Sequence, residues 1–491
     1  MITALLIAFP FLAALLMLVI PAQRVKQMAL LATLIQAAIT AYVIYSFDLY
    51  EKQSLLANMQ FILREQWIPG FGISFFVGID GISLLMLILT NFLLPFIVLA
   101  TWNRESDRQG LFYFLILFMQ SALVGVFVSL DAFLYYIFWE LALIPIYFIV
   151  LLWGGENRVK ITFKFFIYTL LGSLLMLAGI IWMYLHTYDR SFGIDAFYET
   201  VMDLNAQRWI FWAFFIAYAI KIPVLPFHSW QPDTYTTAPT PGTMLLSGIM
   251  LKMGIYSIFR WVLPVTPLAV AAYTDVVLIM CIAGIVYASW IAIGQKDLKR
   301  MFAWSSIAHV GMITAGIFTL SQTGFQGALI QTLAHGVNAV GLFFVAEIFL
   351  RRRGTTMIDE LGGIRAKAPV FASVFMIITF ASVALPLTNA FIGEFLILSS
   401  LYEYSWLFSA IAGLSVILGA VYMLRGYKNT VLGKESEAGF ADLNTAEKWV
   451  FIPIAGLIIF FGIFPQFIFN LTDESVKYLL EQISNHMAMN Y

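Results

Sequence analysis

Apolar segments recur along the whole chain, and short connections that carry polar residues, Gly or Pro separate them. An α-helix needs about 20 predominantly apolar residues to cross a bilayer. The pattern therefore predicts an all-α polytopic membrane protein with about fourteen transmembrane helices and no soluble domain. The expected spans are 1–21, 27–46, 79–101, 110–130, 132–152, 162–186, 208–227, 240–263, 270–293, 299–320, 324–350, 369–402, 405–427 and 447–470.

The distribution of Lys and Arg among the connections predicts how the chain is oriented. Nineteen of the 27 Lys and Arg residues follow odd-numbered spans, six follow even-numbered spans, and Lys221 and Lys252 lie within the membrane. Cytoplasmic connections of membrane proteins carry an excess of Lys and Arg. We therefore expect both termini on the non-cytoplasmic side, and we expect Arg351, Arg352 and Arg353 to form a solvated cytoplasmic anchor.

Two of the long apolar segments contain a proline break. Leu225-Pro226 interrupts the seventh expected helix, and Leu385-Pro386 interrupts the twelfth about 160 residues later. If helices 4–8 and 9–13 form two units, five spans per unit make the second an inverted repeat. Broken helices in matching places of inverted halves indicate a transport site, because unwound backbone at membrane depth is tolerated where it lines protein or water. A packing kink is the alternative for either break.

This spacing divides the chain into four expected regions. Residues 1–109 hold helices 1–3, residues 110–263 the first five-helix repeat, and residues 264–432 the second, inverted repeat. Residues 433–491 hold the last transmembrane helix and a short C-terminal tail.

Ionisable residues near the middle of the expected helices carry the functional argument. A charged residue at a helix centre costs about 2.5–3.5 kcal/mol on insertion scales, so four of them cost on the order of 10 kcal/mol before pairing. Burial disfavours the charged form of each group and a neighbouring opposite charge favours it, so small rearrangements could move a proton. We predict a hydrated row for proton translocation in which Glu140 pairs with Lys221 and Glu394 forms the exit. The predicted row consists of Glu140, Lys221, Lys252, His309, His335 and Glu394.

Less specific explanations exist for the same residues. Lys221 and Lys252 could extend their ammonium groups to an interface, although both lie many residues from a helix end. His309 and His335 could be hydrogen-bonded packing residues. Further polar residues near the first break are candidate gating residues: Lys164, His228, Asp233 and Arg260.

Composition narrows the function classes. Hydrophobic residues make up 61% of the chain and charged residues 11%, the mean hydropathy is +0.88, and the formal net charge of -1 gives no field for nucleic acid. Cys281 is the single cysteine, which is too few for an iron–sulfur cluster. No nucleotide-binding or zinc motif is present, so we expect neither cofactor nor metal in this chain.

Several segments resemble the antiporter-like, proton-translocating membrane subunits of respiratory complex I. They include WELALIPIYF at 139–148, KFFIYT at 164–169 and IGEF at 392–395. The first two favour the M-type branch, and the short expected tail argues against the L-type branch. The resemblance implies a fourteen-helix fold with inverted repeats, and it matches all six residues of the predicted row to polar positions of the family.

The resemblance also implies the protein's setting. FMN, iron–sulfur clusters, NADH and quinone would belong to partner subunits, and the partners would be L-like and N-like neighbours, the peripheral arm and membrane lipids. The implied location is the bacterial inner membrane. The main alternative is a subunit of a multi-subunit cation/proton antiporter, and a membrane hydrogenase or formate-linked complex is another.

Overall fold

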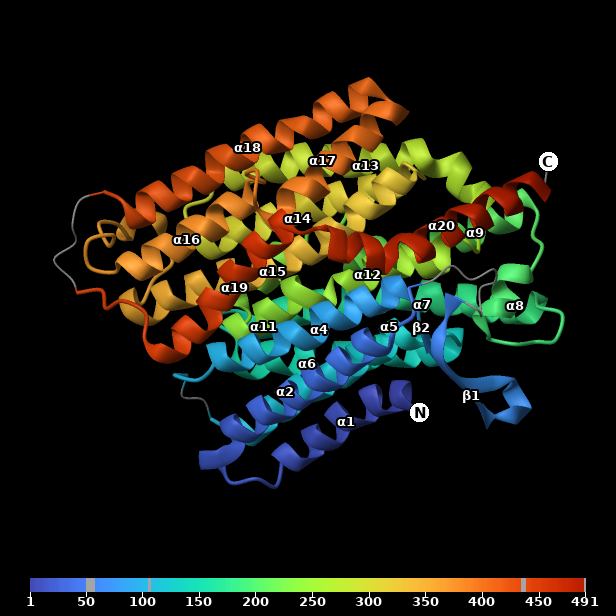
Figure 1. The fold of residues 1–491 in the computed structure, drawn as a ribbon, viewed down its shortest axis with the longest axis horizontal. Coiled ribbons are helices and arrows are strands. Elements are labelled where there is room, and N and C mark those ends of the chain that lie inside the picture. The colour runs from blue at the N-terminus through green and yellow to red at the C-terminus, as the bar shows by residue number, and fades with distance from the viewer. Residues whose placement is uncertain (50–57, 105–106, 434–438, 490–491) are drawn as a thin grey trace.

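The computed structural model describes residues 1–49, 58–104, 107–433 and 439–489, and helices dominate it (Figure 1). The helices of the first part are α1 Ile2–Met17, α2 Ala22–Ser46, α4 Gly81–Ala100, α5 Gln109–Val128, α6 Ala132–Trp153, α7 Arg158–His186, α8 Ile194–Glu199, α9 Leu204–Lys221, α10 Gln231–Thr237, α11 Thr240–Leu245 and α12 Lys252–Ser257. The others are α13 Pro267–Ile293, α14 Leu298–Phe318, α15 Gln322–Arg353, α16 Pro369–Ser382, α17 Asn389–Tyr404, α18 Trp406–Val431, α19 Thr445–Ile463 and α20 Gln466–Met489.

The predicted multi-pass helical fold is confirmed. Among the described residues, 11 helices are long and apolar enough to cross a membrane, and each coincides with an expected span. The three remaining expected spans fall on α1, which has 16 residues, and on the interrupted segments α9–α10 and α16–α17. The number of crossings therefore stays a prediction.

Both predicted helix breaks are present. α9 ends at Lys221 and α10 begins at Gln231, whereas α16 ends at Ser382 and α17 begins at Asn389. Proline lacks a backbone N–H and cannot continue a helical hydrogen-bond ladder, which explains the two positions. The segment 240–262 has a further irregularity that the sequence did not reveal, because the π-helical turns η2 Leu246–Met250 and η3 Ile258–Val262 flank α12.

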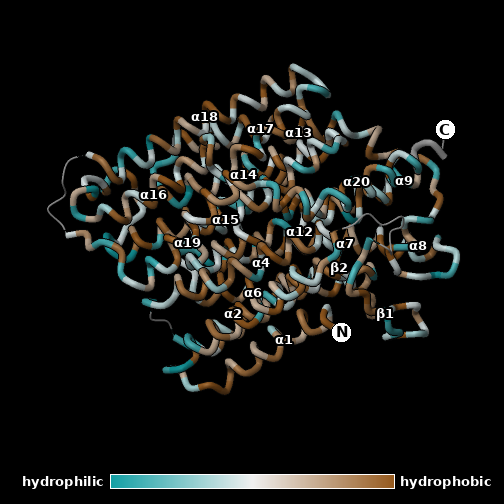
Figure 2. The backbone as a smooth tube through the Cα atoms, viewed as in Figure 1, coloured by the Kyte–Doolittle hydropathy of each residue, from teal (hydrophilic) through white to brown (hydrophobic). Residues whose placement is uncertain are grey.

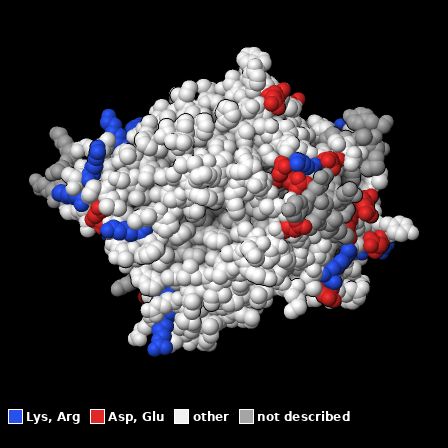
Figure 3. All heavy atoms as spheres, viewed as in Figure 1, with Lys and Arg blue, Asp and Glu red and all other residues white. Residues whose placement is uncertain are grey.

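The helices lie side by side in an elongated array that largely follows the chain order (Figure 1). α1 and α2 lie at one edge, and α17 and α18 lie at the opposite edge. α19 and α20 return across the array and pack against α4 and α15. Figure 2 shows hydrophobic residues along most of the chain, and Figure 3 shows charged side chains mainly at the two ends of the visible face. The uncharged belt between these ends is suited to face lipid.

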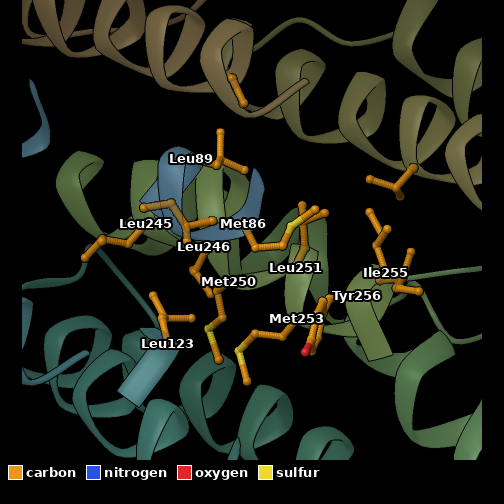
Figure 4. Close-up of a cluster of buried hydrophobic side chains, with 14 of the residues drawn as sticks. Met86, Leu89, Leu123, Leu245, Leu246, Met250, Leu251, Met253, Ile255 and Tyr256 are labelled. Atoms are coloured by element: carbon orange, nitrogen blue, oxygen red, sulfur yellow. The ribbon is translucent and has the colours of Figure 1, made fainter. Parts of the chain in front are cut away.

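The core surrounds the irregular segment 240–262 (Figure 4). Its buried apolar side chains pack against α4 and α5, which places α12 deep inside the protein rather than at the lipid surface. The labelled members of this cluster are Met86, Leu89, Leu123, Leu245, Leu246, Met250, Leu251, Met253, Ile255 and Tyr256.

Two elements were not predicted from the sequence. Residues 60–79 form an antiparallel hairpin of β1 Gln60–Ile68 and β2 Ile73–Ile79, joined by the 3-10 turn η1 Pro69–Phe71 and by Gly72 at a φ of 66°. The expected short C-terminal tail is instead part of the 24-residue helix α20. Asp473 of α20 accepts hydrogen bonds from Gln322 and Gln326 at 2.8 Å, which fastens α20 to the start of α15.

The expectation of a solvated arginine anchor is wrong for two of its three residues. Arg351 and Arg352 are largely buried, and both pair with the buried Glu447 of α19 at 3.1 and 2.5 Å. Glu347 also lies 3.7 Å from Arg351, one helical turn away. These pairs join the C-terminal end of α15 to the N-terminal end of α19.

Candidate functional site

Lys252 and His335 form the centre of the buried polar row. Lys252 is fully buried at the start of α12, and its Nζ donates a hydrogen bond to the Ser247 carbonyl at 2.5 Å. The same Nζ lies 2.7 Å from His335 Nδ1, and His335 Nε2 lies 3.0 Å from Ser306 Oγ. A lysine and an imidazole at hydrogen-bond distance can exchange a proton, provided that one of the two is neutral.

His309 and Glu394 form the next pair along the row. His309 Nδ1 lies 3.3 Å from Glu394 Oε1, and Gln331 Nε2 donates to the same oxygen at 3.1 Å. The rings of His309 and His335 are 5.9 Å apart between centroids. The structure therefore places four of the six predicted residues next to one another in space, in the order Lys252, His335, His309 and Glu394.

Two small cavities lie beside these four residues. The first offers about 20 Å³ to the centres of water molecules and is lined by His309, His335, Ser247 and other polar residues. This exceeds the roughly 10–15 Å³ that one water needs. The second offers about 10 Å³ on the other side of His309, beside Glu394 and Tyr422. Buried Ser289 and Ser415 in its wall have no hydrogen-bond partner within the described protein, as expected where water binds.

Glu140 and Lys221 form a separate group. Lys221 is buried at the end of α9, and neither its Nζ nor Glu140 Oε1 has a hydrogen-bond partner within the described part of the chain. The expected direct pair is therefore not formed in this conformation. Lys221 Nζ instead lies 5.2 Å from the centre of the Trp139 ring, while the charge of Glu140 still acts on it.

Three of the four candidate gating residues surround the first break. Asp233 of α10 lies 3.3 Å from Lys164 of α7 and 3.0 Å from Arg300 of α14. Lys164 also donates to the Ser229 carbonyl at 2.7 Å. The ring of His228 packs against the aromatic rings of Tyr287 and Trp304.

Arg260 lies apart from these three residues. It is buried in η3 and lies 2.6 Å from Asp80, the N-cap residue of α4, with Tyr256 and Ser83 as further neighbours. The Tyr198 hydroxyl donates to the Arg260 carbonyl at 2.8 Å. Arg260 therefore closes the end of segment 240–262 against α4, whereas Asp233 belongs to the helix that precedes this segment.

Sequence reasoning missed the uncharged and distant members of the site. Ser306 and Gln331 are uncharged, and their sequence signal is their helical spacing from His309 and His335. Lys299 begins the expected span 299–320 and is not among the predicted site residues, but it is buried and donates to the carbonyls of Thr236 and Ala238 at 3.2 and 2.6 Å. Among the described residues, no group of three or more His, Cys, Asp or Glu could hold a metal ion.

Known proteins with similar sequences are subunits of respiratory enzymes. NADH-quinone oxidoreductase subunit M of Rickettsia typhi is 38% identical over 463 residues, which covers 93% of this chain and 92% of the relative. The protein of the same name from Rhodobacter capsulatus is 35% identical, with 94% and 91% covered. NADH-ubiquinone oxidoreductase chain 4 of Arabidopsis thaliana is 35% identical, with 98% and 97% covered.

Solved structures show the same fold. A chain of respiratory complex I from Thermus thermophilus with bound NADH matches with a TM-score of 0.89 and 28% identity, covering 98% of this chain and 100% of that chain. A chain of the Mrp complex from Dietzia sp. DQ12-45-1b matches with a TM-score of 0.85 and 18% identity, covering 100% and 99%. Residues 129–419, which include all six residues of the predicted row, match the family described as NADH:quinone oxidoreductase/Mrp antiporter, TM. This chain therefore belongs to the NADH:quinone oxidoreductase/Mrp antiporter transmembrane family.

Proposed function

We propose that this chain is a proton-translocating membrane-arm subunit of an NADH:quinone oxidoreductase, of the M type. The observation that carries the proposal is the buried row formed in space by Lys252, His335, His309 and Glu394. In this row Lys252 Nζ lies 2.7 Å from His335 Nδ1, and His309 Nδ1 lies 3.3 Å from Glu394 Oε1. Ionisable groups are costly within a membrane, and where they occur they mark pathways for ions or protons. The relatives named subunit M cover more than nine-tenths of the chain and supply the enzyme class.

The geometry supports transfer along the row in defined steps. A proton on Lys252 Nζ can pass to His335 Nδ1, and the cavity beside both histidines can hold the water that carries it toward His309. Glu394 then accepts it from His309 Nδ1. Glu140 and Lys221 form the other end of the row, where approach of the carboxylate to the ammonium group would stabilise the charged lysine and separation would release its proton.

The redox chemistry belongs elsewhere in the assembly. FMN, iron–sulfur clusters, NADH and quinone would bind in partner subunits, and L-like and N-like neighbours and lipids would surround this chain. The bacterial inner membrane is the proposed location, with both termini on the non-cytoplasmic side. Support for this orientation comes from the excess of Lys and Arg after odd-numbered spans. We also propose that 110–263 and 264–432 are inverted repeats, since each contains one broken helix.

Native electrophoresis of mildly solubilised membranes tests the assembly. We expect the band that contains this chain to oxidise NADH in the gel and to contain cluster-bearing partners by mass spectrometry. A smaller assembly without redox partners would contradict the proposal and support the cation/proton antiporter subunit instead. Glu140→Gln then tests the transport role, because it should stop proton pumping without removing the subunit from the complex.

A further inference from the structure

The two groups of buried charges have no direct connection among the described residues. Lys221 Nζ lacks a hydrogen-bond partner there. Lys252 Nζ bonds to Ser247 and His335, which belong to its own group and not to the group of Lys221. Where α12 packs on α9, Gly254 lies against the side chain of Ile222 and the backbone carbonyl of Tyr218, neither of which has a proton to donate. A proton that moves between the two lysines therefore needs other polar groups.

The short helix α10 contacts the surroundings of both lysines. Trp230, at its N-terminal end, donates from Nε1 to the carbonyl of Ile220 at 2.9 Å, next to Lys221. Tyr235, near its C-terminal end, has Gln231 and Ser247 as the polar neighbours of its hydroxyl, but the hydroxyl forms no hydrogen bond within the described protein. Ser247 is the residue whose carbonyl accepts from Lys252. One helix of seven residues thus reaches from one lysine toward the other.

Two side chains of α10 are buried without hydrogen-bond partners. Gln231 and Tyr235 are both 0% exposed, and neither amide atom of Gln231 nor the hydroxyl of Tyr235 has a partner within the described protein. Buried polar groups normally have a hydrogen-bond partner, and ordered water supplies that partner where the protein does not. These three atoms therefore mark places for ordered water along α10.

Residues from both halves of the protein hold α10 in place. Asp233 is bound by Lys164 from α7 and by Arg300 from α14. Lys299 of α14 donates to carbonyls at the C-terminal end of α10, where a cation is favourable because the helix dipole is negative there. The position of Gln231 and Tyr235 is thus fixed by ionic contacts at both ends of the helix.

We propose that Gln231 and Tyr235, with ordered water, carry protons between Lys221 and Lys252. The inference rests on the proposed transport function. An ammonium proton leaves Lys221, each water and the Tyr235 hydroxyl release one proton as they accept another, and neutral Lys252 becomes an ammonium group. Gln231 keeps its protons and orients the water through its amide.

Two isosteric substitutions in the assembled complex test this relay. Gln231→Leu and Tyr235→Phe remove polar atoms and keep most of the volume. We expect the double variant to lower the proton-pumping rate of inverted membrane vesicles about tenfold. This is less than the roughly 10²–10⁴-fold that a proton-transfer group contributes, because flanking water remains. Reduction of a water-soluble artificial acceptor by NADH should stay at the wild-type level, which shows that the redox partners are intact, and native electrophoresis should show the complex at its wild-type size, which shows that assembly is intact. Tyr113→Phe and Gln36→Leu are matched controls, because both wild-type residues are buried and hydrogen-bonded away from α10.

A merely structural role predicts a different result. If Gln231 and Tyr235 only fill space, their apolar isosteres should leave the thermal stability unchanged or raise it, because the wild-type polar atoms have no partner within the described protein. Pumping would also stay at the wild-type rate. That result would overturn the relay. If the double variant assembles poorly, Tyr235→Phe alone is measured, because it removes a single oxygen. A high-resolution structure of the complex without water between Tyr235 and Ser247 would also overturn it. If Glu140→Gln stops pumping and the α10 variants do not, only the relay fails; if none affects pumping, the proposed function fails.

Discussion

Replacing Glu394 by Gln removes the negative charge at the proposed exit and keeps the shape of the side chain. The Glu394 Oε1 atom lies 3.3 Å from His309 Nδ1 and accepts from Gln331. A glutamine at 394 can still accept the Gln331 hydrogen bond through its own amide oxygen. The substitution therefore separates the effect of charge from the effect of packing.

The expected magnitude follows from the distance. Two unit charges 3.3 Å apart attract by about 5 kcal/mol at an effective dielectric constant of about 20. Moving one proton against 100 mV takes about 2.3 kcal/mol. Because loss of the carboxylate removes more free energy than this work, His309 should no longer take up a proton at a useful rate. We expect the pumping rate of Glu394→Gln to fall at least about tenfold, since about 1.4 kcal/mol corresponds to a factor of ten.

The assay compares proton uptake by inverted vesicles with NADH oxidation in the same preparation. Glu403→Gln is the matched control, because Glu403 is an exposed glutamate on the same helix, α17. Pumping by Glu394→Gln at the wild-type rate would refute the reasoning, because the charge opposite His309 would then be dispensable. An equal loss in Glu403→Gln would show a general effect of charge on α17 rather than a role for the exit.

Three further predictions follow from single contacts. Lys252→Met should lower pumping at least about tenfold, because it removes the proton donor to His335 and the barrier rises by at least about 1.4 kcal/mol; unchanged vesicle pumping would contradict this. Glu447→Ala should destabilise the protein by about 3 kcal/mol, the lower end for a broken buried pair, because it leaves the largely buried Arg352 without its carboxylate and Arg351 with Glu347 alone. An unaltered melting temperature in detergent would contradict this assignment. Partial burial acts to raise the pKa of Asp442, but backbone N–H groups at 370, 371 and 443 donate to its carboxylate and hold the pKa below its usual value. Asp442→Ala should therefore cost about 0.5–2 kcal/mol near neutral pH. Because the native pKa is the lower one, this difference should persist above about pH 4 and shrink as the pH falls further; a pH-independent difference would contradict it.

The sequence predicted those features that depend on local chemistry. Proline breaks at 226 and 386 were predictable because proline interrupts helical hydrogen bonding wherever it occurs. The six residues of the row were recognisable because charges and imidazoles are conspicuous within apolar helices. Their order in space, from Lys252 to Glu394, depends on how α12, α14, α15 and α17 pack, and the helical period alone does not determine this packing.

Other features depend on contacts between distant segments or on mixed patterns. Asp80 lies 180 positions before Arg260, so their pairing at 2.6 Å leaves no signal in either local segment. α20 carries Asp, Glu and Lys on one face, so it lacks the apolar run by which the spans were recognised. The hairpin at 60–79 also mixes charged and apolar residues, so its pattern predicts a connection between spans rather than two strands.

The separation of the row into two groups constrains how transport can work. Lys221 and Lys252 are both buried, so desolvation penalises the ammonium form of each. Two ammonium ions also repel each other, so a proton that arrives at one lysine disfavours a proton on the other, and this coupling is reciprocal. Glu140 can offset the penalty at Lys221 when it approaches, whereas Lys252 has no carboxylate but the imidazole of His335 as its side-chain partner among the described residues. A change in the position of Glu140 would thus decide which lysine holds the proton, and the contacts that fix α10 between them would decide whether the proton can pass.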